Sequence, residues 1–391
     1  MLTPILALAI AMFAVGVDTY IVVSIIPAVA DDLGEPVAAV GLVASAYALP
    51  TALLAPIFGP LSDRRGRRTA MTIGLIIFIG AAAGSIVAPT LPVLLLTRAV
   101  NGLGAAIILP AVFAYAGDIP DLVERNKAMG VISSAFPLST LLGLPVGALI
   151  ATLGGWRGAF VFVTIIAIVA LVLVRALCPA DRPKTEQPLG YLASYRTILV
   201  DRSALKLLAT TFIWFIAPLG LFVFLAEFIH VTYGIPTTQA GLFLLVVGGV
   251  GVVASRLSGR FMAVVGPRNA VLIAIGAFST AAALMPFSTG ALPLSVLVMA
   301  LWASGTWFGV PAITAIMAAH SEKLRGTMLA FNSSAFSLSG VIGPILIGVI
   351  VASAGFSVAF WVASLMGIGA FALAWYVLPR PQLATQPAAA A

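Results

Sequence analysis

Long apolar segments recur along the whole chain, and they constrain its fold more than any other feature. The sequence of 391 residues is 61% hydrophobic and only 8% charged, whereas a soluble domain carries about 25% charged residues. A helix needs about 20 mainly apolar residues to cross the hydrocarbon core of a bilayer. We therefore expect an all-α polytopic membrane protein with twelve transmembrane helices. The apolar segments are 5–30, 38–61, 69–89, 91–116, 126–152, 157–178, 204–230, 238–260, 268–289, 292–318, 325–352 and 357–378.

The loop Gly59–Arg68 separates two of these segments and carries four of the chain's 20 Lys and Arg residues within five positions. Clustered Arg in a short loop between spans indicates the cytoplasmic side. If both termini are cytoplasmic, nearly all basic residues fall in cytoplasmic loops; the exceptions are Arg98, inside a span, and Arg157, outside. The sequence thus predicts a multi-pass protein of the bacterial cytoplasmic (inner) membrane with both termini in the cytoplasm.

An internal repeat divides the chain into two similar halves. When the sequence is shifted by 200 residues, Ser133-Ser134-Ala135-Phe136 falls on Ser333-Ser334-Ala335-Phe336. Arg125 falls on Arg325 under the same shift. Sequence repeats of this kind are typical of transporters built from two related bundles. We expect six-helix bundles at 1–178 and 204–378, a polar cytoplasmic linker at 179–203 and a disordered tail at 379–391.

Three motifs make the chain similar to a known family. Gly59–Arg68 resembles the signature loop between spans 2 and 3 of the major facilitator superfamily. Arg98-Ala99-Val100-Asn101-Gly102 resembles its span-4 motif, and Gly143-Leu144-Pro145-Val146-Gly147 resembles the span-5 motif of its antiporters. The closest resemblance is to the bacterial twelve-span drug/proton antiporters and their sugar or nucleoside efflux relatives. It implies transport by alternating access, with protons and a small molecule as the partners.

The same composition argues against other classes of function. The single cysteine, Cys178, and two remote histidines, His230 and His320, leave no metal cluster and no catalytic constellation. No phosphate-binding loop is present, so we expect no nucleotide cofactor. Because no catalytic constellation is present, we also expect that the chain is not an enzyme. The net charge of +7 lies in loops, where it sets topology and meets anionic lipid rather than nucleic acid. We expect a monomer in the lipid bilayer.

Charged residues inside the spans are candidates for proton coupling, because each costs roughly 2.5–3.5 kcal/mol to insert. Asp18 lies deep in the first span, where burial favours the protonated carboxyl. Arg98 keeps its charge and lowers the pKa of a nearby acid. Glu227, near the outer end of the seventh span, is a further candidate. The structural alternatives are a capping role for Asp18, an Arg98 that reaches the interface, and an interfacial pair of Glu227 with His230.

The loop Gly59–Arg68 has two interpretations. One is that its Arg residues only determine topology. The other follows from the resemblance, which implies a charge network of Asp63, Arg67 and Asp118 that places Asp63 against the start of the eleventh span. Such a network would hold the cytoplasmic ends together and stabilise the outward-open state, with Gly59 allowing a close helix approach. The matching loop of the second half has no Asp, which favours this second interpretation.

Small residues in the fifth and eleventh spans predict an interface between the two bundles. Gly, Ala and Ser allow transmembrane helices to approach closely. We expect the fifth span to pack against the eleventh at this interface; ordinary packing within each bundle is the alternative. The residues concerned are Gly143, Pro145, Gly147, Gly343 and Pro344.

The substrate cavity is expected near the midplane between the bundles. A mainly apolar and aromatic lining with few charges suits a neutral, cationic or amphipathic molecule. The sequence therefore favours a proton-coupled exporter of a drug-like, sugar or nucleoside-like compound; the alternative is a proton-coupled uptake symporter or facilitator. The candidate lining residues are Tyr20, Asn101, Tyr115, Trp214, Trp302, Trp307 and Asn332.

Overall fold

The computed structural model describes residues 2–179, 191–235, 243–321 and 323–378, and these form α-helices joined by short connections. The all-α membrane fold is confirmed, and the described residues contain no β-strand. The helices in chain order are α1 (Leu2–Leu33), α2 (Val37–Val40), α3 (Leu42–Arg65), α4 (Arg67–Ile86), α5 (Leu91–Gly117), α6 (Leu122–Ser133), α7 (Ala135–Gly154), α8 (Arg157–Leu177), α9 (Tyr191–Val200), α10 (Arg202–Val223), α11 (Leu225–Tyr233), α13 (Phe243–Ser288), α14 (Leu292–His320) and α15 (Arg325–Val377).

Eight of the described helices are long and apolar enough to cross a membrane. Two of them, α13 and α15, contain 46 and 53 residues, more than twice the length that one crossing needs. Each bends at a glycine with positive φ, Gly266 at 81° in α13 and Gly355 at 83° in α15. Glycine adopts this conformation readily because it has no Cβ. Each long helix therefore contains two of the apolar segments that the sequence shows.

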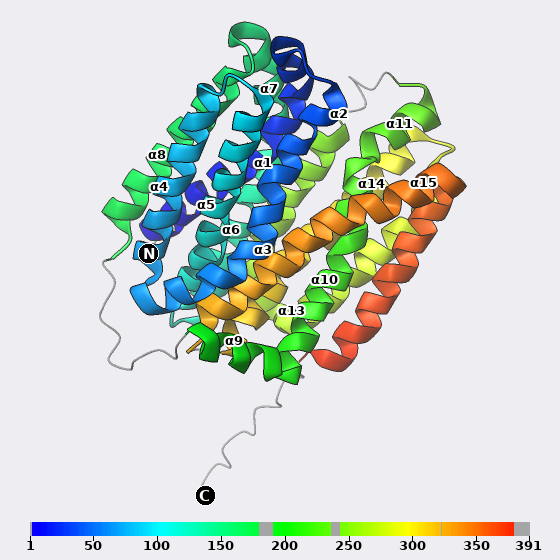
Figure 1. Ribbon diagram of the computed structural model, residues 1–391. Helices are drawn as coiled ribbons and strands as arrows, with labels where there is room; N and C mark the ends of the chain where they lie inside the picture. The colour runs from blue at the N-terminus through cyan, green and yellow to red at the C-terminus, as the bar shows by residue number, and fades with distance from the viewer. Residues whose placement is uncertain (1, 180–190, 236–242, 322, 379–391) are drawn as a thin grey trace, which may run out of the picture.

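Helices α1–α8 and α10–α15 lie on opposite sides of the molecule in Figure 1. We call them the N-terminal group and the C-terminal group. Helix α9 lies across one end of both groups (Figure 1). The hydroxyl of its Tyr195 donates a hydrogen bond of 2.9 Å to the Ile57 carbonyl of α3.

The two groups meet along two main helix contacts. Helix α15 packs on α3, and α13 packs on α6 and α7. In the second contact small residues bring the backbones together: a Cβ added to Gly248 of α13 would lie 3.0 Å from the Pro137 carbonyl oxygen of α7. A Cβ on Gly259 would lie 2.7 Å from the Asn126 carbonyl oxygen of α6. The predicted pairing of the fifth span with the eleventh is therefore wrong, because each packs on another helix of the opposite group.

The motif glycines Gly143 and Gly343 pack within their own groups, which also corrects the prediction. A Cβ on Gly143 would lie 3.7 Å from the Cβ of Tyr20 in α1, and one on Gly343 would lie 2.2 Å from the Ile216 carbonyl oxygen of α10. Gly343 thus permits a helix approach that a larger residue would prevent. Gly147 is buried in α7 and Pro344 is half-buried in α15.

Matching hydrogen bonds hold these helix pairs together in both groups. Ser139 donates to the Phe13 carbonyl at 3.2 Å, and Ser339 donates to the Phe212 carbonyl at 2.8 Å. The internal repeat in the sequence therefore encodes the same contact twice, once in each group.

Candidate functional site

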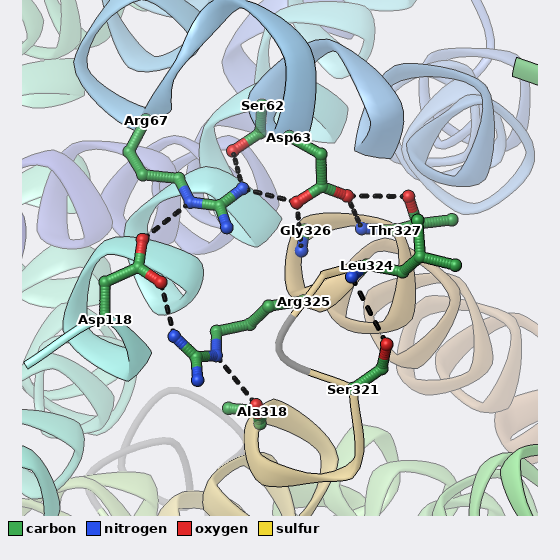
Figure 2. A network of polar contacts seen from close by, with 10 residues as sticks. All are labelled: Ser62, Asp63, Arg67, Asp118, Ala318, Ser321, Leu324, Arg325, Gly326 and Thr327. Carbon is green, nitrogen blue, oxygen red and sulfur yellow. Dashed lines mark hydrogen bonds and ion pairs between the residues drawn. The ribbon is translucent and has the colours of Figure 1, made fainter. Parts of the chain in front are cut away.

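A carboxylate from one group caps a helix of the other group at the end that carries the Arg-rich loop. Asp63 lies in the last turn of α3 and is 1% exposed. Its Oδ1 accepts a hydrogen bond of 2.8 Å from the Gly326 amide (Figure 2). Its Oδ2 accepts bonds from the Thr327 amide at 2.8 Å and from the Thr327 hydroxyl at 2.7 Å. These amides belong to the first turn of α15, where a helix lacks internal acceptors and its dipole favours negative charge.

The local sequence explains why this cap comes from another helix. Leu324 precedes α15 and makes no side-chain cap, since an aliphatic side chain cannot accept a hydrogen bond. The position after Arg325 lies directly against the network: a Cβ on Gly326 would lie 2.7 Å from Oδ1 of Asp63 and 2.8 Å from Nη1 of Arg67, so a larger residue would displace these side chains. Gly326 is therefore a functional position that the sequence motifs did not reveal.

Arg67 extends the network within the N-terminal group. It is the first residue of α4, follows Gly66 with φ of 92°, and is 5% exposed. Its Nη1 donates to Oδ1 of Asp63 at 2.6 Å and to Oγ of Ser62 at 3.1 Å. Its Nε donates to Oδ2 of Asp118 at 2.9 Å (Figure 2). The turn at Gly66 thus places a guanidinium between two carboxylates, as the sequence predicted.

Asp118 provides a second link between the network and the C-terminal group. It lies at the C-terminal end of α5 and accepts a charge-assisted hydrogen bond from Nη1 of Arg325. Nε of Arg325 also donates to the Ala318 carbonyl of α14 at 2.7 Å (Figure 2). Arg325 was not among the predicted network residues, although the repeat that aligns it with Arg125 marked its position. The Asp118 side chain is 44% exposed, so solvent screens this pair more than the Asp63 pair.

A second network lies inside the N-terminal group and brings together two predicted proton-coupling residues. Asp18 of α1 is fully buried and Arg98 of α5 is 1% exposed. Nη1 of Arg98 lies 2.6 Å from Oδ1 and 2.7 Å from Oδ2 of Asp18. Nδ2 of Asn101 donates to Oδ2 at 3.0 Å. Asn101 therefore belongs to this ion-pair site rather than to the cavity lining that the sequence suggested.

Aromatic rings cover the Arg98 guanidinium. Its Cζ lies 4.6 Å from the centre of the Tyr47 ring of α3 and 5.7 Å from that of Phe160 in α8. Nε of Arg98 and Oδ1 of Asn101 have no hydrogen-bond partner among the described residues. The two buried charges stabilise each other, and loss of either partner would leave the other charge buried and unpaired.

The remaining candidate residues are placed differently from one another. Glu227 is exposed on α11 and forms no ion pair within the described ranges. Nδ1 of its neighbour His230 lies 2.7 Å from the Ile235 carbonyl oxygen. Gly59 and Pro145 lie in α3 and α7, at positions whose packing falls outside the described residues. The structure brings Glu227 to neither charged network.

Two small cavities lie along the interface of the groups. Tyr20, Trp302 and Trp307 line the first, of about 20 Å³. Trp307 and Asn332 line the second, of about 50 Å³. Sites for small molecules usually measure about 300–1,000 Å³. The described conformation is therefore too tightly packed here to hold such a ligand.

Besides Asn101, two predicted lining residues are absent from both cavities. Trp214 is fully buried and packs on Phe215, with ring centres 4.4 Å apart. A Cβ on Gly309 would overlap the Trp214 ring, so this glycine makes room for it. Tyr115 is half-buried in α5 and lines neither described cavity. Thr211, which donates a 2.9 Å hydrogen bond to Oδ1 of Asn332, is a lining residue that was not predicted.

Comparison with known proteins agrees with these features. The model of the family described as Major Facilitator Superfamily matches residues 8–323 and 308–391. An uncharacterized MFS-type transporter of Bacillus subtilis is 26% identical over 382 residues, 96% of this chain and 92% of the relative. A chloramphenicol resistance protein of Streptomyces lividans is 29% identical over 280 residues, 68% of this chain and 70% of the relative.

A solved structure shares the fold. The crystal structure of the human organic anion transporter MFSD10 superposes with a TM-score of 0.80 at 21% identity, and the match covers 95% of this chain and 98% of that one. Long apolar helices, two related groups and the family match over most of the sequence lead to one assignment. The chain is a multi-pass membrane transporter, not an enzyme, and belongs to the major facilitator superfamily.

Proposed function

We propose that this transporter exports a small molecule from the cytoplasm in exchange for protons. The observation that carries the proposal is the buried pair of Asp18 and Arg98, 2.6 Å apart. A charge pair at this depth is costly to insert and is a weak source of stability compared with apolar packing. A carboxyl that alternates between protonated and ionised forms gives the pair a function.

The chemistry follows from the two partners. Arg98 remains charged throughout, so it favours the ionised form of Asp18 when the two are in contact. When Asp18 binds a proton, the attraction to Arg98 falls and the carboxyl can move away from it. Protonation of Asp18 and separation of α1 from α5 are therefore coupled, and each favours the other.

The network around Asp63 supports a defined order of steps. It holds α3, α5 and α15 together at the end that we assign to the cytoplasm from its Arg-rich loop. With this end closed, the opposite end is the one able to open. In this state Asp18 is ionised, faces Arg98 and awaits a proton from outside. Proton binding then permits the rearrangement that opens the cytoplasmic end for substrate.

The lining of the two interface cavities supports a substrate with little negative charge. Aromatic rings and a few hydroxyl and amide groups line them, including Trp307, Thr211 and Asn332. None of the described residues that line them is charged. A neutral or cationic amphipathic molecule would fit such a surface, and the chloramphenicol resistance relative makes chloramphenicol a first compound to test.

Transport in membrane vesicles tests the proposal. A thermal-shift screen of the purified protein against antibiotics, sugars and nucleosides first identifies a ligand. A pH gradient with an acidic lumen is then imposed on inverted vesicles, and accumulation of that ligand in the lumen is followed. We expect gradient-driven accumulation by the native chain and none by Asp18→Asn. Accumulation in right-side-out vesicles under an inward proton gradient would instead show uptake, and would overturn the proposed direction.

A matched variant separates coupling from general damage. Asp31 lies on the same helix as Asp18 but is exposed, so Asp31→Asn should transport normally. The same vesicles report exchange of ligand without a gradient. Asp18→Asn should retain this exchange while it loses the gradient-driven step. Full gradient-driven accumulation by Asp18→Asn would show that another group carries the proton.

A further inference from the structure

A further cavity lies apart from the interface cavities, at the end of the molecule that carries the Asp63 network. Its volume is about 470 Å³, within the usual range for a small-molecule site. It is formed by both groups, because α6 of the N-terminal group meets α10, α13, α14 and α15 there. Neither the ion pair of Asp18 nor the network of Asp63 contributes a residue to it.

Cationic and ionisable basic groups line this cavity. The lining contains Arg125 of α6, Arg268 of α13 and His320 of α14, and no acidic residue among those described. Beside the cavity, Oδ2 of Asp201 lies 2.7 Å from Nε2 of His320. His320 therefore has a carboxylate partner, whereas Arg268 makes no ion pair within the described ranges.

Arg268 is held in place by backbone carbonyls rather than by a carboxylate. Its Nη2 donates to the Trp375 carbonyl at 3.0 Å and its Nε donates to the Leu378 carbonyl at 3.3 Å. These bonds fix the guanidinium at the end of α15 without a carboxylate partner among the described residues. A fixed guanidinium with an apolar neighbourhood suits a phosphate group, which it can bind through parallel hydrogen bonds.

The rest of the lining is mainly apolar. The walls include Leu207, Val265, Ile316 and Val377. A free inorganic anion would gain nothing from such walls, whereas an amphiphile would place its hydrocarbon there and its anionic head at the guanidinium groups. The chemistry thus indicates an amphipathic anion.

Residues beside the cavity place it at the membrane surface. Trp375 and Tyr376 are 54% and 77% exposed near the end of α15. Arg268 lies 4.8 Å from the centre of the Trp375 ring, and Nζ of Lys206 lies 5.2 Å from that of Tyr376. Exposed Trp and Tyr beside basic residues are typical of the headgroup region of a bilayer. Basic pockets between helices on the cytoplasmic side are suited to anionic lipid headgroups.

We propose that this cavity binds the headgroup of an anionic phospholipid of the inner leaflet, with its phosphate between Arg268 and Arg125. Both helix groups form the cavity, so the lipid stabilises the arrangement described here over any in which α6 moves away from α10 and α13. The lipid thereby acts as a regulator of the closed end, independently of the identity of the transported substrate.

The test uses the full chain in a neutral detergent and follows thermal unfolding by tryptophan fluorescence. We expect phosphatidylglycerol to raise the unfolding temperature, and phosphatidylcholine or glycerol 3-phosphate to leave it unchanged. Ala319→Trp fills the cavity without changing its charge and should abolish the effect. Arg125→Gln and Arg268→Gln should each weaken the apparent affinity for phosphatidylglycerol roughly fivefold.

A control variant on α13, the helix that carries Arg268, completes the experiment. Arg260 of α13 is exposed and does not line the cavity, so Arg260→Gln removes the same charge and should respond as the native chain does. An equal response of Ala319→Trp, Arg125→Gln and Arg260→Gln would overturn the site. Equal stabilisation by glycerol 3-phosphate would overturn the assignment to lipid. If Arg268→Gln fails to fold because the carbonyls at the end of α15 lose their donor, Ala319→Trp, Arg125→Gln and Arg260→Gln still test the site.

Discussion

The starts of α6 and α15 occupy matching positions in the two halves of the sequence, yet they are completed in opposite ways. Helix α6 follows Asp121, whose own side chain accepts a hydrogen bond of 2.7 Å from the Glu124 amide. Before α15, the matching Ser321 likewise accepts a hydrogen bond of 3.2 Å from the Leu324 amide, but the Gly326 and Thr327 amides of the first turn donate to Asp63 of the other group. One helix start is therefore independent of the arrangement of the groups, whereas the other is complete only when the groups meet.

The contacts that these helices make across the interface differ in the same way. Helix α6 meets α13 through close backbone packing, as at Gly130, where a Cβ would lie 2.6 Å from the Ser255 carbonyl oxygen. Helix α15 meets α3 through charges and hydrogen bonds around Asp63. Contacts of the first kind hold two helices at a fixed distance, and those of the second kind break when one charge is lost. We infer that loss of a single charge loosens the α3–α15 contact more than the α6–α13 contact.

The largest effect should come from Asp63→Asn. This change removes a buried charge that Arg67 and the α15 amides share, and it should cost the closed state about 3–5 kcal/mol. Since each 1.4 kcal/mol is a tenfold change in population, the closed end should open at least about a hundredfold more often. The measurement is the rate at which a membrane-impermeant thiol reagent labels Ser333→Cys, a cavity-lining position, in a Cys178→Ala background.

The matching variant in the other half is Asp121→Asn. Asn keeps an oxygen that can accept from the Glu124 amide, and Asn and Asp cap a helix about equally well, so the change should cost little and stay confined to α6. Its labelling rate at Ser333→Cys should equal that of the parent. If both Asn variants increase labelling to the same extent, the contrast between the two helix starts is wrong.

A medium effect is expected from adding one methyl group at each contact. Gly259→Ala places a Cβ 2.7 Å from the Asn126 backbone oxygen, which cannot move without moving α6, and overpacking of this kind costs about 1–3 kcal/mol. Gly326→Ala meets the ends of the Asp63 and Arg67 side chains instead, and these can rotate away. Thermal unfolding should show the larger loss for Gly259→Ala, and Ser333→Cys labelling the larger gain for Gly326→Ala. A larger loss of unfolding temperature for Gly326→Ala together with a larger gain in labelling for Gly259→Ala would contradict this assignment of the two contacts.

The smallest effect is expected from Glu124→Gln. Its carboxylate pairs with Lys127 at 2.8 Å on the surface of α6, with both side chains more than a third exposed. Exposed pairs of this type contribute about 0–1 kcal/mol. The unfolding temperature should therefore change little, and labelling at Ser333→Cys should not change. A marked opening by Glu124→Gln would show that α6 also carries a charge-dependent contact.

Several site residues could be predicted because their chemistry is unusual for their surroundings. Asp18 and Arg98 are charges within apolar segments, and the structure places them 2.6 Å apart. The network of Asp63, Arg67 and Asp118 was instead implied by the family resemblance, and Arg67 contacts both carboxylates. The resemblance placed Asp63 against the start of the eleventh span, but it did not specify which groups of that helix start meet the network. Gly326 and Arg325 were therefore not predicted as members.

The predictions that failed share one physical cause. Small residues such as Gly143 and Gly343 indicate that a helix approaches another closely, but they do not say which helix. The same limit applies to Trp214 and Asn101, which were expected in the cavity and lie in packing and in the ion-pair site. The facing of a residue on a transmembrane helix depends on all its neighbours, because lipid and protein present similar apolar surfaces.

The sequence by itself determined the membrane fold, the repeat and the types of charge at the site. Segment length and hydropathy act locally, and the cost of exposing backbone groups in lipid leaves few alternatives to helices. The tertiary structure alone decided that α15 borrows its cap from Asp63, that the two contacts between the groups differ in kind, and that Arg125 and Arg268 border one cavity. These features need side chains hundreds of residues apart to meet, and only the packing of the whole bundle brings them together.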